Sequence, residues 1–140
     1  MSQRYAGDLT PAEAWALLES EPAAELIDVR TDAEWVFVGR PDLAALGKQV
    51  RFVPWLYFPG GRQNADFTQQ VEATGLSKDQ TLLFICRSGQ RSAFAAAAMT
   101  AAGYGPCYNV AEGFEGDHDA EWHRGRLGGW KVAGLDWVQD

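Results

Sequence analysis

The sequence predicts an α/β domain in which helices cover both faces of a central, mostly parallel sheet of about five strands, a three-layer α/β/α arrangement. Two observations predict this class. Short apolar stretches typical of buried strands alternate along the chain with segments that carry helix start and stop signals. Strands that are joined through helices pair in parallel by right-handed crossovers, and a parallel sheet needs cover on both of its faces.

Capping residues mark where the helices begin. Thr10 with Glu13, and Thr31 with Glu34, have the spacing of a capping box, in which two side chains and two backbone N–H groups bond reciprocally. The second pair is expected to start only one or two helical turns. Longer helices are expected over residues 10–20, over residues 64–75 with Asn64 as the cap, and over residues 92–103.

Apolar runs mark the strands. Residues 80–85 (QTLLFI) are apolar almost throughout, which is typical of a central strand that is covered on both faces. Pro54 cannot donate to a sheet ladder and is expected to stop a second strand. Strands are accordingly expected over residues 24–29, 49–55, 80–85 and 106–110, and the chain after Val110 is expected to be rich in loops.

Charge and hydropathy exclude several classes of partner. The 140 residues carry a formal net charge of -7, which opposes nucleic-acid phosphates and anionic membrane surfaces. The opening residues lack the apolar core of a signal peptide, and no later run reaches membrane-spanning length. We therefore expect one soluble, cytoplasmic domain over residues 1–140, with neither nucleic acid nor a membrane as its partner.

The two cysteines are expected to be free. Cys86 ends one predicted strand and Cys107 begins the next, so in neighbouring parallel strands they lie four residues apart along the axis, about 13 Å. A disulfide requires Cα atoms within about 7 Å. Cys107 is therefore expected to be an inert, buried thiol, as is typical of structural cysteines.

The segment that begins at Cys86, "CRSGQRS" (86–92), has the composition of an anion-binding turn. It joins the predicted central strand to a helix that is expected to begin near Ser92, and backbone N–H groups at a helix N-terminus hold anions and favour a thiolate. Gly89 permits backbone angles that a side chain would resist. Arg87 and Arg91 add positive charge on either side of it. The pattern predicts a nucleophilic cysteine inside an anion cradle.

"CRSGQRS" resembles the active-site loop of the rhodanese sulfurtransferases, and three further segments agree in the family's order. They are "LIDVRTDAEWVFVGR" (26–40), "NVAEGFEGD" (109–117) and "GGWKVAGLDW" (128–137), the last especially as in bacterial single-domain members. The resemblance covers nearly the whole chain and implies a rhodanese-like domain of the thiosulfate sulfurtransferase type.

The resemblance implies a mechanism in which Cys86 takes a sulfane sulfur from a small anionic donor such as thiosulfate, becomes a persulfide, and passes the sulfur to cyanide or to a thiol or protein acceptor. No cofactor is implied. The donor and the persulfide are expected to be bound by the residues of the loop: Arg87, Ser88, Gly89, Gln90 and Arg91. Either arginine could bond an acidic neighbour instead of the substrate.

Two other functions stay open at this point. Related phosphatases and arsenate reductases enclose a tetrahedral oxyanion in a Cys-x5-Arg loop, whereas the loop from Cys86 to Arg91 is Cys-x4-Arg, one residue shorter. A non-catalytic binding or sulfur-relay module is the second alternative, although such scaffolds usually lack the cysteine. The sequence does not identify the physiological donor or acceptor.

Several other residues are expected to have structural roles. Asp28 and Arg30, at the end of a strand, are expected to support the rim of the site rather than to do chemistry. His118 and His123 match no metal-ligand spacing, and no metal is expected. Two tryptophans near predicted strand ends are expected to line the pocket: Trp35 and Trp55.

Overall fold

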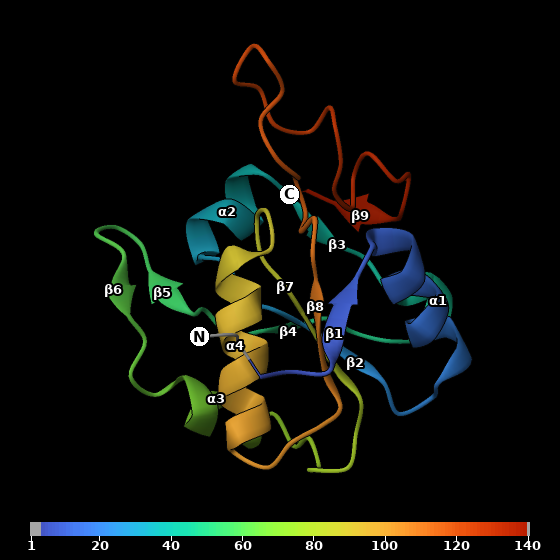
Figure 1. Ribbon diagram of the computed structural model, residues 1–140, viewed down its shortest axis with the longest axis vertical. Helices are drawn as coiled ribbons and strands as arrows, with labels where there is room; N and C mark the ends of the chain where they lie inside the picture. The colour runs from blue at the N-terminus through green and yellow to red at the C-terminus, as the bar shows by residue number, and fades with distance from the viewer. Residues whose placement is uncertain (1–3, 140) are drawn as a thin grey trace.

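A central sheet of five parallel strands forms the middle of the structure, a computed structural model that describes residues 4–139 (Figure 1). The strands lie in the order β1-β8-β7-β2-β4, so the apolar strand β7 is the middle one, as predicted. Every pairing in this sheet is parallel, which confirms the predicted fold class. The bounds are Gly7–Leu9 for β1, Glu25–Asp28 for β2, Arg51–Phe52 for β4, Leu82–Ile85 for β7 and Cys107–Val110 for β8.

Helices cover both faces of the sheet. On one face lie α3 (Phe67–Ala73) and α4 (Gln90–Ala101), and on the other lies α1 (Pro11–Ser20). The chain around Phe114 and Trp130 completes the cover beside α1. The short helix α2 (Asp32–Phe37) follows β2 at the carboxyl ends of the strands, and a single 3-10 turn spans Ala44–Leu46.

The middle strand shows why the sheet needs both layers. Leu82 and Phe84 of β7 pack toward α3 and α4, whereas Leu83 and Ile85 pack toward α1. All four side chains are fully buried. Alternate residues of a strand point to opposite faces, so a strand that is apolar at every position has to be covered on both sides. This packing fixes the strand that carries Cys86 at its end.

Both predicted capping boxes are present. Thr10 and Thr31 each accept a hydrogen bond from the backbone N–H three residues later, and Glu13 and Glu34 return bonds to the cap N–H groups. These reciprocal bonds satisfy N–H groups that a helix start leaves without partners, which is why α1 and α2 begin where the sequence predicts.

Two predicted helix starts are wrong. The predicted helix at residues 64–75 begins only at Phe67, because the Asn64 side chain accepts from the Asp66 N–H and donates to Pro54 and Gln70 instead of capping the helix. The predicted helix at residues 92–103 begins two residues early, at Gln90, because Gly89 takes a left-handed conformation and turns the chain directly into α4.

The sequence also missed the shortest strands and overestimated one. The predicted strand at residues 49–55 is reduced to the two residues of β4. The edge strand β1 was not foreseen, nor were two antiparallel pairs outside the main sheet. These pairs are β3 (Arg40–Pro41) with β9 (Trp137–Val138), and β5 (Leu56–Tyr57) with β6 (Arg62–Gln63). Strands of two or three residues are too short to show a periodic pattern.

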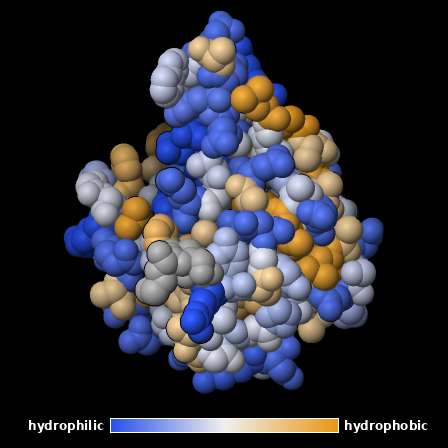
Figure 2. Space-filling model, in the orientation of Figure 1, coloured by the Kyte–Doolittle hydropathy of each residue, from blue (hydrophilic) through white to orange (hydrophobic). Residues whose placement is uncertain are grey.

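Part of the chain after β8 projects past the carboxyl ends of the sheet strands, at the top of Figure 1. Figure 2 shows that this projection is mostly hydrophilic, in keeping with the loop-rich sequence after Val110. Among residues 4–139, no helix has the length and apolar character needed to cross a membrane.

Candidate active site around Cys86

Cys86 follows the last residue of β7, at the end of the sheet where ligands bind in open parallel α/β folds. Its neighbour Ile85 pairs in register with Asp28 of β2, so the ends of the two strands lie level, as predicted. The cysteine is 1% exposed. The chain then makes a short turn and enters α4, so that Cys86 lies beside the N-terminus of this helix.

Gly89 forms the turn and supplies a hydrogen bond to the sulfur. Its φ of 101° is in the left-handed region that favours glycine, and a Cβ at this position would collide with the backbone carbonyl of Ala111. The Gly89 N–H donates to Cys86 Sγ at 3.2 Å. Of the N–H groups that the loop was expected to direct at the sulfur, this one forms a hydrogen bond with it.

Ser92, which the sequence treated only as the start of a helix, also contacts the sulfur. Its hydroxyl Oγ lies 3.2 Å from Cys86 Sγ and 2.6 Å from Asn109 Oδ1 on β8. Both side chains are buried. A buried polar residue at the carboxyl end of a strand is the signal that could have singled out Asn109, but nothing in the sequence pairs it with Ser92.

The segment after β8 supports the loop from behind. The Phe114 N–H donates to the carbonyl of Cys86 at 2.8 Å, and the Glu115 N–H donates to the carbonyl of Arg87 at 2.9 Å. A Cβ on Gly113 would lie 2.6 Å from the Cys86 carbonyl oxygen, so only glycine permits this approach. The buried Trp130 donates its backbone N–H to Gly113 and holds this support in place.

Arg91 is held by an acidic neighbour, one of the two alternatives that the sequence left open. Its guanidinium binds both carboxylate oxygens of Glu34 at 2.7 and 3.0 Å. Burial raises the pKa of Glu34, but the hydrogen bonds and charge of Arg91 outweigh burial and lower it overall. Glu34 therefore does more than cap α2, because it joins α2 to the first turn of α4.

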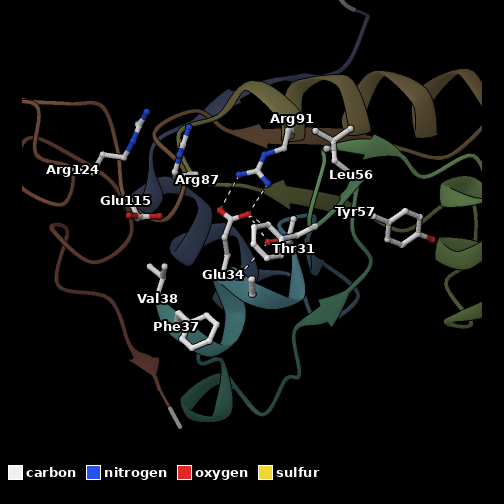
Figure 3. Close-up of a pocket in the computed structure, with 13 residues that line it drawn as sticks. Thr31, Glu34, Phe37, Val38, Leu56, Tyr57, Arg87, Arg91, Glu115 and Arg124 are labelled. Carbon is white, nitrogen blue, oxygen red and sulfur yellow. Dashed lines mark hydrogen bonds and ion pairs between the residues drawn. The ribbon is translucent and has the colours of Figure 1, made fainter.

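Arg87 stands at the edge of an open cavity of about 600 Å³ (Figure 3). Arg87, Arg124 and Glu115 gather on one side of this cavity, and Leu56 and Tyr57 of β5 lie on the opposite side. Figure 3 draws no hydrogen bond or ion pair from Arg87 to another lining residue. Its exposed guanidinium is therefore available to an anionic ligand, unlike that of Arg91.

The remaining loop residues lie away from this cavity. Ser88 is half-buried and Gln90 is the exposed first residue of α4, and neither lines the cavity. The structure thus brings Gly89 and Ser92 to the Cys86 sulfur and places Arg87 and Arg91 at the cavity. Cys86, which is 1% exposed, is not among the residues that line this cavity.

Asp28 and Arg30 form an ion pair beneath the rim. Both residues are fully buried, and the Arg30 guanidinium binds the Asp28 carboxylate through Nε and Nη2, with a shortest distance of 2.8 Å. Arg30 also donates to the carbonyl of Gly39 and lies 4.3 Å from the centre of the Phe114 ring. The pair therefore ties the end of β2 to the chain that follows α2 and to the segment that supports the cysteine loop.

The prediction for the two tryptophans is wrong, because neither lines the main cavity. Trp55 packs edge-on against Phe67 of α3 and joins the core on that face. Trp35 packs against Phe52 and borders a separate cavity of about 150 Å³. In the projecting loop, the ring of His118 lies 5.0 Å from that of Trp122.

The family model for the rhodanese-like domain matches residues 10–120, which include the cysteine loop and both strands beside it. The chain belongs to the rhodanese-like family. The matched residues cover well over half of the chain, and they contain three of the four segments on which the resemblance was based: "LIDVRTDAEWVFVGR", "CRSGQRS" and "NVAEGFEGD".

Proteins similar in sequence or in fold to this rhodanese-like chain match it over nearly its full length. An uncharacterised protein of Rickettsia conorii is 35% identical over 131 residues, which cover 93% of the chain and 95% of that protein. The crystal structure of Rv0390 from M. tuberculosis is 47% identical, covers 98% of this chain and 100% of its own, and superposes with a TM-score of 0.91. A polysulfide-sulfur transferase homodimer from Wolinella succinogenes shares the fold, at 22% identity and a TM-score of 0.65, over 95% of this chain and 78% of its own.

Proposed function

We propose that the protein is a sulfurtransferase in which Cys86 carries a transient persulfide. The observation that carries this proposal is the placement of the Cys86 sulfur at the N-terminus of α4, with the Gly89 N–H donating to it. Membership of the rhodanese-like family supports sulfur transfer, as does the fold shared with a polysulfide-sulfur transferase. The chain acts as one domain in a reducing compartment such as the cytoplasm, where its two free thiols persist.

In the first step, the Cys86 thiolate attacks the outer sulfur of a small anionic donor such as thiosulfate. A bond forms between Sγ and that sulfur, the sulfur–sulfur bond of the donor breaks, and its electron pair leaves with sulfite. Arg87 faces the cavity with its guanidinium exposed and supplies a charge-assisted hydrogen bond to the dianionic donor. The N–H groups at the start of α4 stabilise the negative charge of the persulfide.

In the second step, a thiol or cyanide attacks the outer sulfur of the persulfide and regenerates the Cys86 thiolate. The two steps share one covalent intermediate, so ping-pong kinetics are expected. The cavity of about 600 Å³ is far larger than a thiosulfate ion needs. Its apolar wall, which includes Phe37, Val38 and Leu56, is suited to the body of a larger thiol acceptor.

Intact mass spectrometry after incubation with thiosulfate tests the proposal directly. The wild-type protein is expected to gain one sulfur atom, which cyanide then removes, and the Cys86→Ser variant is expected to gain none. Cys107→Ser serves as the matched control, because it removes the other buried thiol and should still gain the sulfur. If wild type gains no sulfur from thiosulfate or from 3-mercaptopyruvate, the domain binds without catalysis.

A further inference from the structure

A chain of hydrogen bonds, buried except at its outer end, runs from the edge of the sheet to the sulfur of Cys86. Asn109 on β8 donates through Nδ2 to the Asp8 carboxylate at 3.0 Å and to the carbonyl of Gly89 at 3.1 Å. On its other side, Asn109 Oδ1 lies 2.6 Å from the Ser92 hydroxyl, which in turn lies 3.2 Å from Cys86 Sγ. Ser92 is fully buried and Asn109 is 4% exposed, so water does not compete for the bonds that join Asn109 to Ser92 and to Gly89, whereas Asp8 at the outer end is exposed.

The partners of Asn109 fix the orientation of its amide. Both neighbours of Nδ2, the Asp8 carboxylate and the Gly89 carbonyl, can only accept, so the NH₂ group has to face them. Its oxygen therefore faces Ser92. An amide oxygen has no hydrogen to give, so the hydrogen between Asn109 and Ser92 at 2.6 Å is the hydroxyl hydrogen of Ser92.

This assignment decides what Ser92 offers to the sulfur. A serine hydroxyl has one hydrogen. While the Ser92 hydroxyl donates it to Asn109 Oδ1, the Ser92 oxygen presents a lone pair to Cys86. We propose that Asn109 and Ser92 are positioning residues that favour the forms of Cys86 whose Sγ carries no negative charge. In the thiol, the S–H donates to Ser92 Oγ, and in the persulfide the charge resides on the outer sulfur.

The thiolate is the form that disturbs the network. A charged Sγ attracts the Ser92 hydrogen, and turning the hydroxyl toward the sulfur leaves Asn109 Oδ1 facing an oxygen without a hydrogen between them. Given the proposed sulfur transfer, this cost applies when an acceptor attacks the outer sulfur, the bond between the two sulfurs breaks, and its electron pair returns to Sγ. The network therefore retains the sulfur on Cys86 until a strong nucleophile arrives.

Charged groups also face this sulfur from the neighbouring elements. From α4, Arg91 lies close enough to interact with the charge of Cys86, and Glu34 of α2 pairs with it. The buried Asp28–Arg30 pair lies at the end of β2, and the exposed Arg87 follows Cys86 in the loop. Asp8 acts from β1 through Asn109. The substitutions of Asn109 and Ser92 leave all of these charges unchanged.

The test measures how fast iodoacetamide alkylates Cys86 across a range of pH, in a Cys107→Ser background so that one thiol is present. Asn109→Leu frees the Ser92 hydroxyl to donate to the sulfur. One net hydrogen bond changes an equilibrium about threefold to tenfold, so alkylation at neutral pH should accelerate by that factor and its pH profile should move to lower pH. This measurement does not depend on sulfur transfer.

Two further variants distinguish the network from a general loosening of the site. In a Ser92→Ala background, Asn109→Leu should leave the pH profile unmoved, because the hydroxyl that transmits its effect is absent. Asp8→Ala removes one acceptor of Nδ2 together with a negative charge, and should shift the profile in the same direction by about twofold in rate. In the Ser92→Ala background it should leave the profile unmoved, which separates the network from the effect of the charge alone.

An unmoved profile in the folded Asn109→Leu protein would overturn the inference, as would an equal shift without Ser92. If Asn109→Leu does not fold, the Asp8→Ala profiles measured with and without Ser92 decide between the same two results.

Discussion

Two buried cysteines on neighbouring strands differ in almost everything except their burial. Cys86 and Cys107 are each 1% exposed. Cys107 begins β8 and pairs in register with Leu82, whereas Cys86 follows the end of β7, so the two sulfurs lie at opposite ends of the sheet, as the sequence predicts. Burial alone therefore does not distinguish a proposed nucleophile from a structural thiol.

The difference lies in the direction of the hydrogen bonds. The Gly89 N–H at the start of α4 donates to Cys86, whereas Cys107 donates its S–H to the carbonyl of Tyr104, just past the end of α4, at 3.5 Å. Burial raises the pKa of the Cys107 thiol, and a hydrogen bond from Thr100 offsets this only in part. The two ends of one helix thus give their cysteines opposite surroundings, because helix N-termini favour anions and C-termini disfavour them.

The largest difference in activity between changes at the two ends of α4 is expected from substitution of the glycines there. Gly89 and Gly103 precede and follow α4 with φ of 101° and 94°, so alanine at either position costs about 1 kcal/mol of stability from backbone strain. A Cβ on Gly89 also collides with the carbonyl of Ala111, whereas a Cβ on Gly103 meets only the flexible Lys78 side chain at 3.6 Å. Gly89→Ala should therefore reduce sulfur transfer at least a hundredfold, and Gly103→Ala should leave it within about twofold.

Sulfur-transfer rates and thermal unfolding of both variants check this prediction together. Equal losses of activity would mean that the conformation of the cysteine loop does not matter for the reaction, and that only the stability of α4 does.

The cysteine loop could be predicted from the sequence because the residues that form it are neighbours along the chain. Gly89, the strand before it and the helix after it are contiguous, and each has its own signal in composition or spacing. The bond between Arg91 and Glu34 joins residues 57 apart, and the bond between Asn109 and Asp8 joins residues 101 apart. Such partners meet only through the strand order, which puts β8 between β1 and β7 and which no periodic pattern reports.

A second comparison uses two ion pairs at the two ends of the sheet. Glu34 and Arg91 pair at the carboxyl end beside the cavity, and Glu25 and Arg51 pair at the amino end at 3.4 Å. Glu34→Gln should destabilise the fold by about 1 kcal/mol and reduce activity several-fold, because it frees the first turn of α4 beside Cys86. Glu25→Gln should leave activity unchanged, and equal activities of the two variants would contradict a role for the Arg91 bond.

The same pair predicts how stability depends on pH. Burial raises the pKa of Glu34, but Arg91 lowers it overall below the ordinary 4.5, so the folded state binds its proton less tightly than the unfolded state does. The stability it contributes is complete above that ordinary value and is lost as the pH falls through the folded-state value. Denaturant unfolding between pH 7 and pH 3 should show a smaller acid loss in Glu34→Gln than in wild type.

The smallest effect is expected at Cys107. Cys107→Ser places a hydroxyl of similar size where the thiol donates to Tyr104, so the fold should lose about 1 kcal/mol and sulfur transfer should stay within about twofold. Its sulfur lies among the apolar side chains beside α3 and α4, on a strand end about 13 Å along the sheet from Cys86. Sulfur cannot pass between the two thiols over that distance without a carrier. A loss of activity much larger than the loss of stability would therefore show that both cysteines take part, and the two ends of the sheet would then act as one site.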